Sequence, residues 1–359
     1  MGERTFLPRL IAWELTGRCN LKCVHCRASA SMEQGDQELS TEEIKNTLDN
    51  IATFASPIII LTGGEPLVRA DVYEIASYAT GKGLKVVLGT NGTLVTPEVA
   101  RRLVEAGIKR VSISIDCAYS GEHDGFRGVP GAFDQAMRGI EACKGAGLPF
   151  QINTTVTSRN MGQLQEIADL AVRLGAVAHH IFLLVPTGRG KAIEDEEISP
   201  EEYERVLNWM YGAQKGGIHM KATCAPHYVR VISQRALEEG IDSTTGRSGL
   251  DASGSGCLGG TGFCFISRTG DVNPCGYLPV KAGNIREKPF REIWESAGLF
   301  LDLRDRRQLK GKCGLCEYKV ACGGCRARAY ASTGDYLAEE PYCVYQPKAW
   351  TRRSAQISK

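Results

Sequence analysis

Residues 10–26 read LIAWELTGRCNLKCVHC, and this stretch decides the fold. Leu10–Glu14 is a short apolar run that predicts a strand, and Cys19, Cys23 and Cys26 follow it in the spacing C-x3-C-x2-C. Three thiolates can bind three irons of a four-iron cluster and leave the fourth iron open for a substrate ligand. The alternatives are chance spacing or a zinc site, although structural zinc normally takes four protein ligands.

A strand followed by a longer helix recurs from residue 10 to residue 185. Helix starts are marked by capping boxes at Ser40 and Ser199, and Gly107 and Gly175 end helices before the next strand. The predicted strands are Leu10–Glu14, Ile58–Leu61, Lys85–Gly89, Arg110–Ile115, Phe150–Val156 and His180–Val185. Six such units predict an α/β fold, a parallel sheet curled into a partial (β/α)6 barrel. The pattern is expected to fail after His219.

Further polar or glycine-rich segments lie at or near the strand ends, where such barrels carry their reactive groups. They include Gly63, Gly64, Glu65, Pro66, Asn91, Ser114, Asp116 and Asn153. Glycines let a backbone approach a ligand closely, and a glutamate can accept a hydrogen bond from an ammonium group. Strand alternation places Ser114 and Asp116 on one face. The alternatives are a plain strand-to-helix turn at the two glycines and ordinary core strands elsewhere.

The chain has 14 cysteines, and its amino terminus has no apolar run that would predict secretion, so a disulfide framework is not expected. Eight of them fall late in the chain, enough for two fully ligated four-iron clusters: Cys257, Cys264, Cys275, Cys313, Cys316, Cys322, Cys325 and Cys343. Two structural zinc sites are the alternative, because C-x2-C pairs favour zinc. Cys117 and Cys143 are interpreted as core residues, and Cys224 receives no role.

The composition of the chain indicates which classes of binding partner to expect. Lys and Arg number 43 against 41 Asp and Glu, so the balance of charge favours neither a nucleic acid nor a membrane surface. No long apolar run predicts a membrane span, and a cytoplasmic protein is expected. Residues 238–262 are rich in Gly, Ser and Thr and predict a linker.

On these motifs the chain is identified as a member of the radical S-adenosylmethionine (SAM) family with a SPASM extension. The resemblance implies a first [4Fe-4S] cluster held by Cys19, Cys23, Cys26 and SAM. It further implies that Gly63–Pro66 receives the SAM amino group, and that Ser114 and Asp116 lie near the ribose or methionine part. Asn91 and Asn153 complete the expected cofactor-binding set.

The SPASM resemblance also implies two auxiliary [4Fe-4S] clusters. One set is Cys257, Cys264, Cys275 and Cys325, and the other is Cys313, Cys316, Cys322 and Cys343. The last pair departs from the family, which commonly spaces it by three residues where Cys322 and Cys325 are separated by two. The expected domains are a radical SAM barrel (1–220), a bridging region (221–256), the SPASM domain (257–347) and a tail (348–359).

Residues 9–347 more closely resemble the radical haem synthases of the siroheme-dependent haem pathway. The stretches that carry this likeness are Arg9–Glu14, Cys23–Arg27, Phe150–Val156, Ala178–Gly190, Lys221–Tyr228 and Cys322–Arg328. The resemblance implies oxidative decarboxylation of two propionates of iron-coproporphyrin III to vinyls, giving haem b. The auxiliary clusters would accept electrons, and ferredoxin or flavodoxin would reduce the first cluster.

Four propionates need cationic partners, for which the candidates are Arg189, Lys191, Lys221 and Arg230. The histidine candidates for contacting the iron or a propionate are His25, His179, His180 and His227. Each histidine can instead be a structural residue, and Arg189 and Lys191 can be solvated loop charges.

Rival functions stay open. A sister enzyme acting on another siroheme derivative would share nearly all these features. A peptide-modifying SPASM enzyme usually adds an N-terminal leader-binding domain, whereas about nine residues precede the first strand here. A zinc-binding or electron-transfer protein would not need the motifs at Gly63–Pro66 and Ser114–Asp116.

Overall fold

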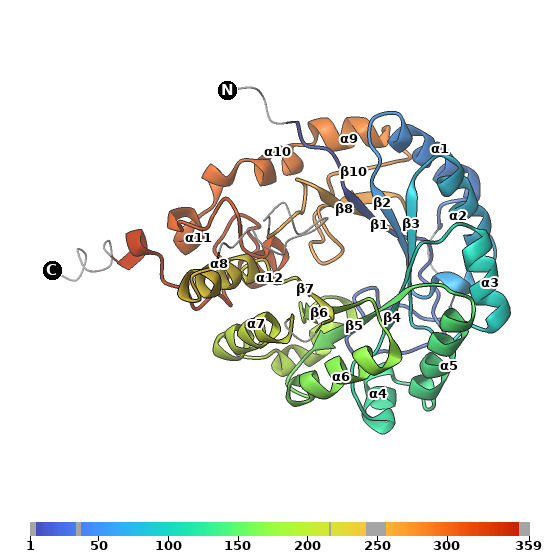
Figure 1. Ribbon diagram of the computed structural model, residues 1–359. Coiled ribbons are helices and arrows are strands. Elements are labelled where there is room, and N and C mark those ends of the chain that lie inside the picture. Colours follow the sequence, from blue (N-terminus) through green and yellow to red (C-terminus); the bar gives the residue numbers. More distant parts are fainter. Residues whose placement is uncertain (1–4, 34–36, 215–216, 242–255, 352–359) are drawn as a thin grey trace.

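The computed structural model describes residues 5–33, 37–214, 217–241 and 256–351. One curved ten-stranded sheet organises them, in the order β10-β9-β8-β1-β2-β3-β4-β5-β6-β7. The strands are β1 (Leu10–Glu14), β2 (Ile58–Thr62), β3 (Lys85–Thr90), β4 (Val111–Ser114), β5 (Phe150–Val156), β6 (Ala178–Leu183), β7 (His219–Thr223), β8 (Phe263–Ile266), β9 (Asp271–Asn273) and β10 (Gly283–Asn284). Figure 1 shows the helices of the first half arranged around the outside of this sheet, as in an open barrel.

The helices alternate with the strands through residue 238. They are α1 (Thr41–Ala52), η1 (Pro66–Val68), α2 (Val72–Gly81), α3 (Pro97–Glu105), α4 (Ser120–Arg127), α5 (Ala132–Gly145), η2 (Met161–Gln163), α6 (Leu164–Leu174), η3 (Gly188–Glu196), α7 (Pro200–Ala213) and α8 (Tyr228–Glu238). The carboxy-terminal region adds α9 (Phe290–Ser296), α10 (Gly298–Arg304), η6 (Arg306–Gln308), α11 (Gly311–Leu315) and α12 (Arg326–Thr333). No helix in the described ranges is long and apolar enough to cross a membrane.

The helix boundaries follow the local signals. Ser40 accepts a hydrogen bond from the backbone of Glu43, whose side chain accepts one from Ser40 in return, and Ser199 makes the same box with Glu202. Each box satisfies two backbone N–H groups that the first helical turn leaves unpaired. Gly175 follows α6 with φ of 83°, a left-handed conformation that glycine adopts without steric cost. The predicted capping signals are confirmed.

The six predicted strands are confirmed with shifts of two residues or fewer. The expectation that the pattern fails after His219 is wrong, because His219 begins β7, which pairs in parallel with β6 and is followed by α8. Within β7 only Met220 is buried. An edge strand with such a small buried surface has no apolar run that would mark it in the sequence.

The carboxy-terminal region joins the same sheet. Strand β8 pairs in parallel with β1, so that Ile11 lies opposite Cys264. The Trp294 indole of α9 also donates a hydrogen bond of 2.8 Å to the carbonyl of Phe6. The predicted domain boundaries stay predictions, and residues 242–255 of the expected linker, like tail residues 352–359, lie outside the described residues.

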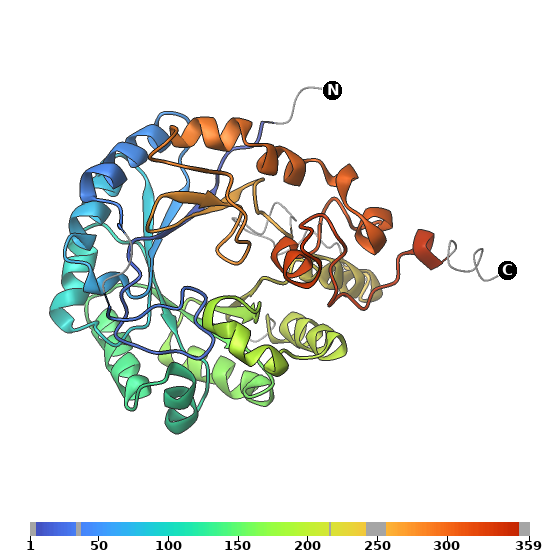
Figure 2. The same ribbon diagram turned by 180° about the vertical axis from the view of Figure 1, so that it is seen from behind.

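The two faces of the parallel strands differ in chemistry. Ile113, Ile152 and Ile181 are buried in the main apolar core, which also contains residues of the surrounding helices. The residues that alternate with them point to the inside of the barrel and are more polar. Figure 2 shows the long blue loop after β1 running across the barrel on this side.

Candidate active site

The loop after β1 gathers the three cysteines of the C-x3-C-x2-C motif. Cys19 and Cys23 are buried and Cys26 is partly buried. The backbone N–H groups of Leu21 and Ala30 point at the sulfurs of Cys19 and Cys26, at 3.4 and 3.5 Å. Burial raises the pKa of Cys19 to about 11, although the hydrogen bond from the Leu21 N–H acts in the opposite direction. The thiol therefore keeps its proton until a metal ion replaces it and binds the thiolate. The loop therefore fits a cluster held by three thiolates.

Helix α4 supports this loop through Arg127. Its Nη1 lies 3.7 Å from the Cys23 sulfur, and its Nη2 pairs with the Asp116 carboxylate at 2.5 Å. Asp116 is fully buried, burial raises its pKa, and it also accepts a hydrogen bond from the Thr155 N–H. We predicted Asp116 beside the ribose or methionine, whereas its contacts orient Arg127. Strand β4 ends at Ser114, so the alternation on which that prediction relied stops before Asp116.

His25 is part of the cluster loop and packs against α4. Its ring stacks on Phe126 of α4 at 4.4 Å between centroids, and its Nε2 lies 4.0 Å from Asp116. Burial, followed by the charge of Arg127, lowers the pKa of His25 well below its usual value. A neutral, packed imidazole agrees with the structural alternative for this residue.

Two glycines at the end of β2 allow the cluster loop to approach. A Cβ on Gly63 would lie 2.7 Å from the Thr16 carbonyl oxygen, and one on Gly64 would lie 2.3 Å from that of Arg18. The N–H of Gly64 donates to the Thr16 carbonyl at 2.7 Å. The structure thus gives these glycines a role against the protein's own backbone, and their approach to a ligand stays a prediction.

Glu65 differs from the ammonium acceptor expected from the sequence. It is fully buried and accepts hydrogen bonds from the Thr90 hydroxyl and the Asn91 N–H, both at 2.8 Å, and from the Leu67 N–H at 3.2 Å. Burial raises its pKa to about 7 against these hydrogen bonds. Glu65 therefore joins the ends of β2 and β3, while the buried Pro66 begins η1.

Asn91 extends this junction to the cluster loop. Its side-chain amide donates to Asn20 at 2.9 Å and lies 3.9 Å from the Cys19 sulfur. Its carbonyl oxygen accepts from the N–H and hydroxyl of Thr93. The predicted residue thus lies directly beside the cluster cysteines.

A polar row crosses the inner face of the sheet. Ser114 of β4, Asn153 of β5, His180 of β6 and Lys221 of β7 are successive register partners, and all are partly exposed. Gln151 links two of them, with its amide nitrogen 2.9 Å from both the Asn153 oxygen and His180 Nδ1. The structure brings these four predicted residues together inside the barrel. Their contact with SAM or substrate stays a prediction.

His179 faces the other way. It is fully buried among the core residues, with Nε2 2.8 Å from the Thr154 hydroxyl, which donates to the Ile115 carbonyl. Burial lowers the pKa of His179 to about 4. Of two adjacent histidines, strand alternation sends one inward and one to the core, so His179 is a structural residue.

Arg189 anchors the cluster loop. Its Nε donates to the Cys23 carbonyl at 2.9 Å and its Nη1 to the Ala30 carbonyl at 2.6 Å. The preceding residue, Gly188, has a φ of 55° and lies close to the cluster loop. A Cβ at this position would lie 2.2 Å from the carbonyl oxygen of Arg27. The predicted propionate clamp is therefore corrected, because this guanidinium already holds the protein backbone.

We expect Arg189→Ala to loosen the cluster loop, since each lost hydrogen bond from a charged donor contributes about 1.5–3 kcal/mol. The variant should retain less iron at Cys19, Cys23 and Cys26 and cleave SAM roughly tenfold more slowly or worse without substrate. Lys191→Ala, at an exposed position of the same η3 segment, is the matched control. Normal cluster content with weakened substrate binding alone would restore the clamp interpretation.

The second auxiliary set is brought together as predicted. Cys313, Cys316, Cys322 and Cys343 line one cavity. Backbone N–H groups point at three of the sulfurs, from Glu340 to Cys313 at 3.3 Å, from Tyr318 to Cys316 at 3.4 Å and from Gly324 to Cys322 at 3.4 Å. Such donors stabilise thiolate ligands and tune clusters.

His227 and Arg230 line the same cavity as these four cysteines. His227 is buried and stacks on Tyr203 at 4.5 Å between centroids. Arg230 is buried and pairs with Glu204 at 2.5 Å. Their predicted roles toward the iron or a propionate are corrected, because α8 packs them against the auxiliary site.

The first auxiliary set needs one correction. Cys275 and Cys325 lie in one small apolar cluster, whereas Cys264 is fully buried in the main core of the sheet. Because β8 pairs with β1, Cys264 is a core residue beside Ile11. Among the described residues, no three His, Cys, Asp or Glu side chains are placed to hold a single metal ion. A four-iron cubane spreads its thiolates more widely, since each binds a different iron.

Comparison with known proteins agrees with this architecture. A family model of the radical SAM superfamily matches residues 13–171, and one of the SPASM iron-sulfur cluster-binding domain matches residues 257–322. The chain belongs to the radical SAM enzymes that carry a SPASM domain, and its cofactors are SAM and [4Fe-4S] clusters.

Within this family, several relatives are similar to this chain over nearly its whole length. The chain is 58% identical to an AdoMet-dependent heme synthase of Methanosarcina barkeri, over 97% of this chain and 99% of the relative. A protein of the same name from Nitratidesulfovibrio vulgaris is 55% identical, over 96% and 94%. The Fe-coproporphyrin III synthase of M. barkeri is 34% identical, over 93% of this chain and 87% of the relative.

Solved structures confirm the fold. Streptococcus suis SuiB bound to its precursor peptide SuiA superposes with a TM-score of 0.73 at 19% identity, over 94% of this chain and 76% of that one. Native anSMEcpe with bound AdoMet and the Cp18Cys peptide superposes with a TM-score of 0.66 at 20% identity, over 98% of this chain and 96% of that one. The partial barrel with its SPASM domain is thus shown independently of sequence likeness.

Proposed function

We propose that this enzyme oxidatively decarboxylates two propionate side chains of iron-coproporphyrin III to vinyl groups and so forms haem b. The observation that carries this proposal is similarity over nearly the whole chain. Three relatives named AdoMet-dependent heme synthase are 54–58% identical. The Fe-coproporphyrin III synthase and a pre-heme d1 synthase reach only 34% and 33%.

The residues suit a reaction that begins with a carbon radical. When bound, the first cluster and SAM supply a 5′-deoxyadenosyl radical that can remove hydrogen from an unactivated carbon. A propionate that loses this hydrogen and carbon dioxide must also give up one electron to become a vinyl. Two further clusters without an open substrate position suit the removal of that electron, and ferredoxin or flavodoxin is the proposed donor for the first cluster.

The inner face of the barrel supplies the proposed substrate contacts. His180 and Lys221 lie side by side in the sheet register, partly exposed, in the same row as Ser114 and Asn153. A lysine ammonium can pair with a propionate carboxylate. Because they share the inner row with Ser114 and Asn153, Lys221 is the preferred cationic partner and His180 the preferred imidazole.

The test is anaerobic incubation of the reconstituted enzyme with iron-coproporphyrin III, SAM and reductant, followed by mass spectrometry of the tetrapyrrole. We expect a transient monovinyl species, then haem b, with two 5′-deoxyadenosines formed per haem because each decarboxylation removes one hydrogen. Lys221→Ala should weaken porphyrin binding while leaving uncoupled SAM cleavage intact, and Lys109→Ala, at an exposed position before β4, is its control.

Two results would contradict the proposal. Turnover of a different siroheme derivative, with no vinyl product from iron-coproporphyrin III, would assign a sister tetrapyrrole reaction. Modification of a peptide, with no tetrapyrrole turnover despite SAM cleavage, would assign a peptide-modifying activity.

A further inference from the structure

We propose that Cys224 supplies the fourth thiolate of the first auxiliary cluster site, together with Cys257, Cys275 and Cys325. Cys224 takes the place that sequence comparison assigns to Cys264. The proposal rests on the cofactor class of the protein and is independent of the identity of its substrate.

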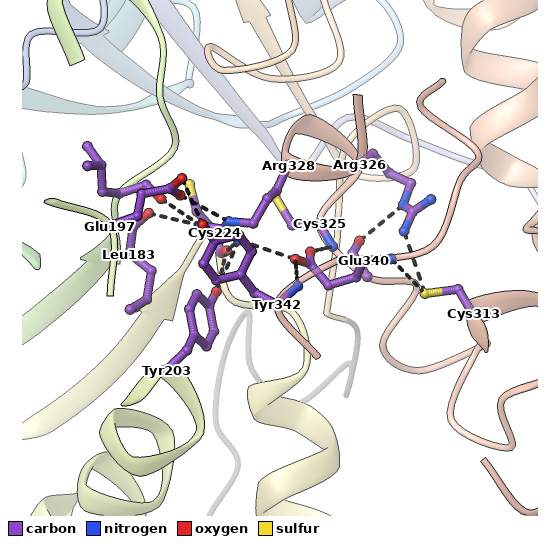
Figure 3. A network of polar contacts seen from close by, with 12 residues as sticks. Leu183, Glu197, Tyr203, Cys224, Cys313, Cys325, Arg326, Arg328, Glu340 and Tyr342 are labelled. Atoms are coloured by element: carbon purple, nitrogen blue, oxygen red, sulfur yellow. Dashed lines mark hydrogen bonds and ion pairs between the residues drawn. The ribbon is translucent and has the colours of Figure 1, made fainter. Parts of the chain in front are cut away.

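The position of Cys224 follows from the unexpected strand β7. Cys224 comes directly after Thr223, the last residue of β7. It packs, with Cys275, against the small apolar cluster that contains Cys325 and is separate from the main core. Figure 3 shows the sulfurs of Cys224 and Cys325 near the same Arg328 side chain. The end of a barrel strand thus delivers a thiol to the carboxy-terminal cysteines.

Backbone contacts agree with this grouping. The N–H of Cys257 donates to the Cys322 carbonyl at 3.0 Å, which places Cys257 beside the segment that contains Cys325. Cys264 stands apart, because it is fully buried in the main core of the sheet, opposite Ile11.

Arg328 fixes the backbone of Cys224 relative to the SPASM region. Its Nη1 donates to the Cys224 carbonyl at 3.0 Å, and the Tyr203 hydroxyl donates to the same oxygen at 2.8 Å. Arg328 belongs to α12, for which Cys325 is the capping residue. One buried guanidinium thus connects the backbone carrying one proposed ligand with the helix that follows another.

The backbone at Cys224 is consistent with a functional requirement for its side chain. Its φ is 60°, and among the described residues only Ser29 is another non-glycine with positive φ. Glycine would adopt this conformation without steric cost. Non-glycine residues persist in such conformations where the surroundings hold them there, and these positions concentrate at functional sites. Glycine is consequently the informative substitution, because it removes the thiol and suits the backbone.

The experiment compares Cys224→Gly and Cys224→Ser with Cys264→Ala in the full chain, after anaerobic reconstitution. Iron, sulfide and zinc are counted, and the reduced and oxidised proteins are examined by EPR. The unsubstituted protein should hold about twelve irons, four in each of three clusters. Cys224→Gly should hold about eight, or show a three-iron cluster, since one iron loses its thiolate. Cys264→Ala should match the unsubstituted protein.

If Cys224→Gly does not fold, Cys224→Ser still tests whether Cys224 binds the cluster. A serine oxygen can replace the thiolate, so we expect retained iron with an altered EPR signal of one auxiliary cluster. Unchanged iron and spectra in either folded Cys224 variant would overturn the proposal. Loss of iron in folded Cys264→Ala alone would return the fourth ligand to Cys264, and stoichiometric zinc would reject an iron-sulfur centre there.

Discussion

Replacing Cys19, Cys23 and Cys26 together by alanine should abolish 5′-deoxyadenosine formation. We assign to these three thiolates the cluster that SAM binds, and Cys117, the next cysteine along the chain, is buried. SAM cleavage should fall to the background rate of the assay, measured by chromatography after anaerobic reduction.

The auxiliary clusters supply the internal control for this triple variant. Their assigned cysteines are Cys224, which directly follows β7, and residues beyond 256, so about eight irons and their EPR signals should remain. Cys143→Ala, which removes a fully buried thiol of α5, tests whether loss of any core cysteine has the same effect. Undiminished SAM cleavage in the triple variant would refute the assignment of the first cluster.

Arg328→Met should destabilise the protein by about 3–5 kcal/mol, the usual cost of leaving one partner of a buried ion pair unpaired. Arg328 is 1% exposed and lies 3.7 Å from the equally buried Glu340 carboxylate. It also donates to the Leu184 carbonyl at 2.7 Å. Figure 3 shows this network joining the end of β6 to the cysteine-rich region.

A double-mutant cycle separates the ion pair from the other contacts of Arg328. Adding Glu340→Gln to Arg328→Met should recover part of the loss, because no unpaired carboxylate remains. Arg101→Met, at an exposed pair on α3, should leave the urea midpoint of the reconstituted enzyme nearly unchanged. Equal midpoints for Arg328→Met and Arg101→Met would show that the buried network is not a stabilising element.

Several candidate residues could not be assigned from the sequence because their surroundings come from distant segments. Arg127 and Asp116 meet only when α4 packs under the loop after β1. Arg189 reaches that loop from beyond β6. Glu65 accepts hydrogen bonds from the end of the neighbouring strand β3. Asp116 and Glu65 are charged residues near strand ends, a pattern that does not distinguish a ligand contact from a contact within the protein.

The sequence by itself determined the class of this protein. The C-x3-C-x2-C spacing after β1, the alternation of strands and helices and the late cysteines are local patterns, and local patterns fix periodicity and ligand spacing. Alternation also placed Ser114 on one face of its strand, and the register of the parallel sheet adds Asn153 to the same face.

Only the tertiary structure decided which cysteines and charges meet. The pairing of β8 with β1 draws Cys264 into the core, and the addition of β7 to the sheet edge brings Cys224 toward Cys325. Both strands are short and carry weak sequence signals, so their places depend on pairing with partners far away in the chain. Cluster ligands must converge in space, and strand pairing decides which cysteines do so. The spacing of cysteines along the sequence does not encode this pairing.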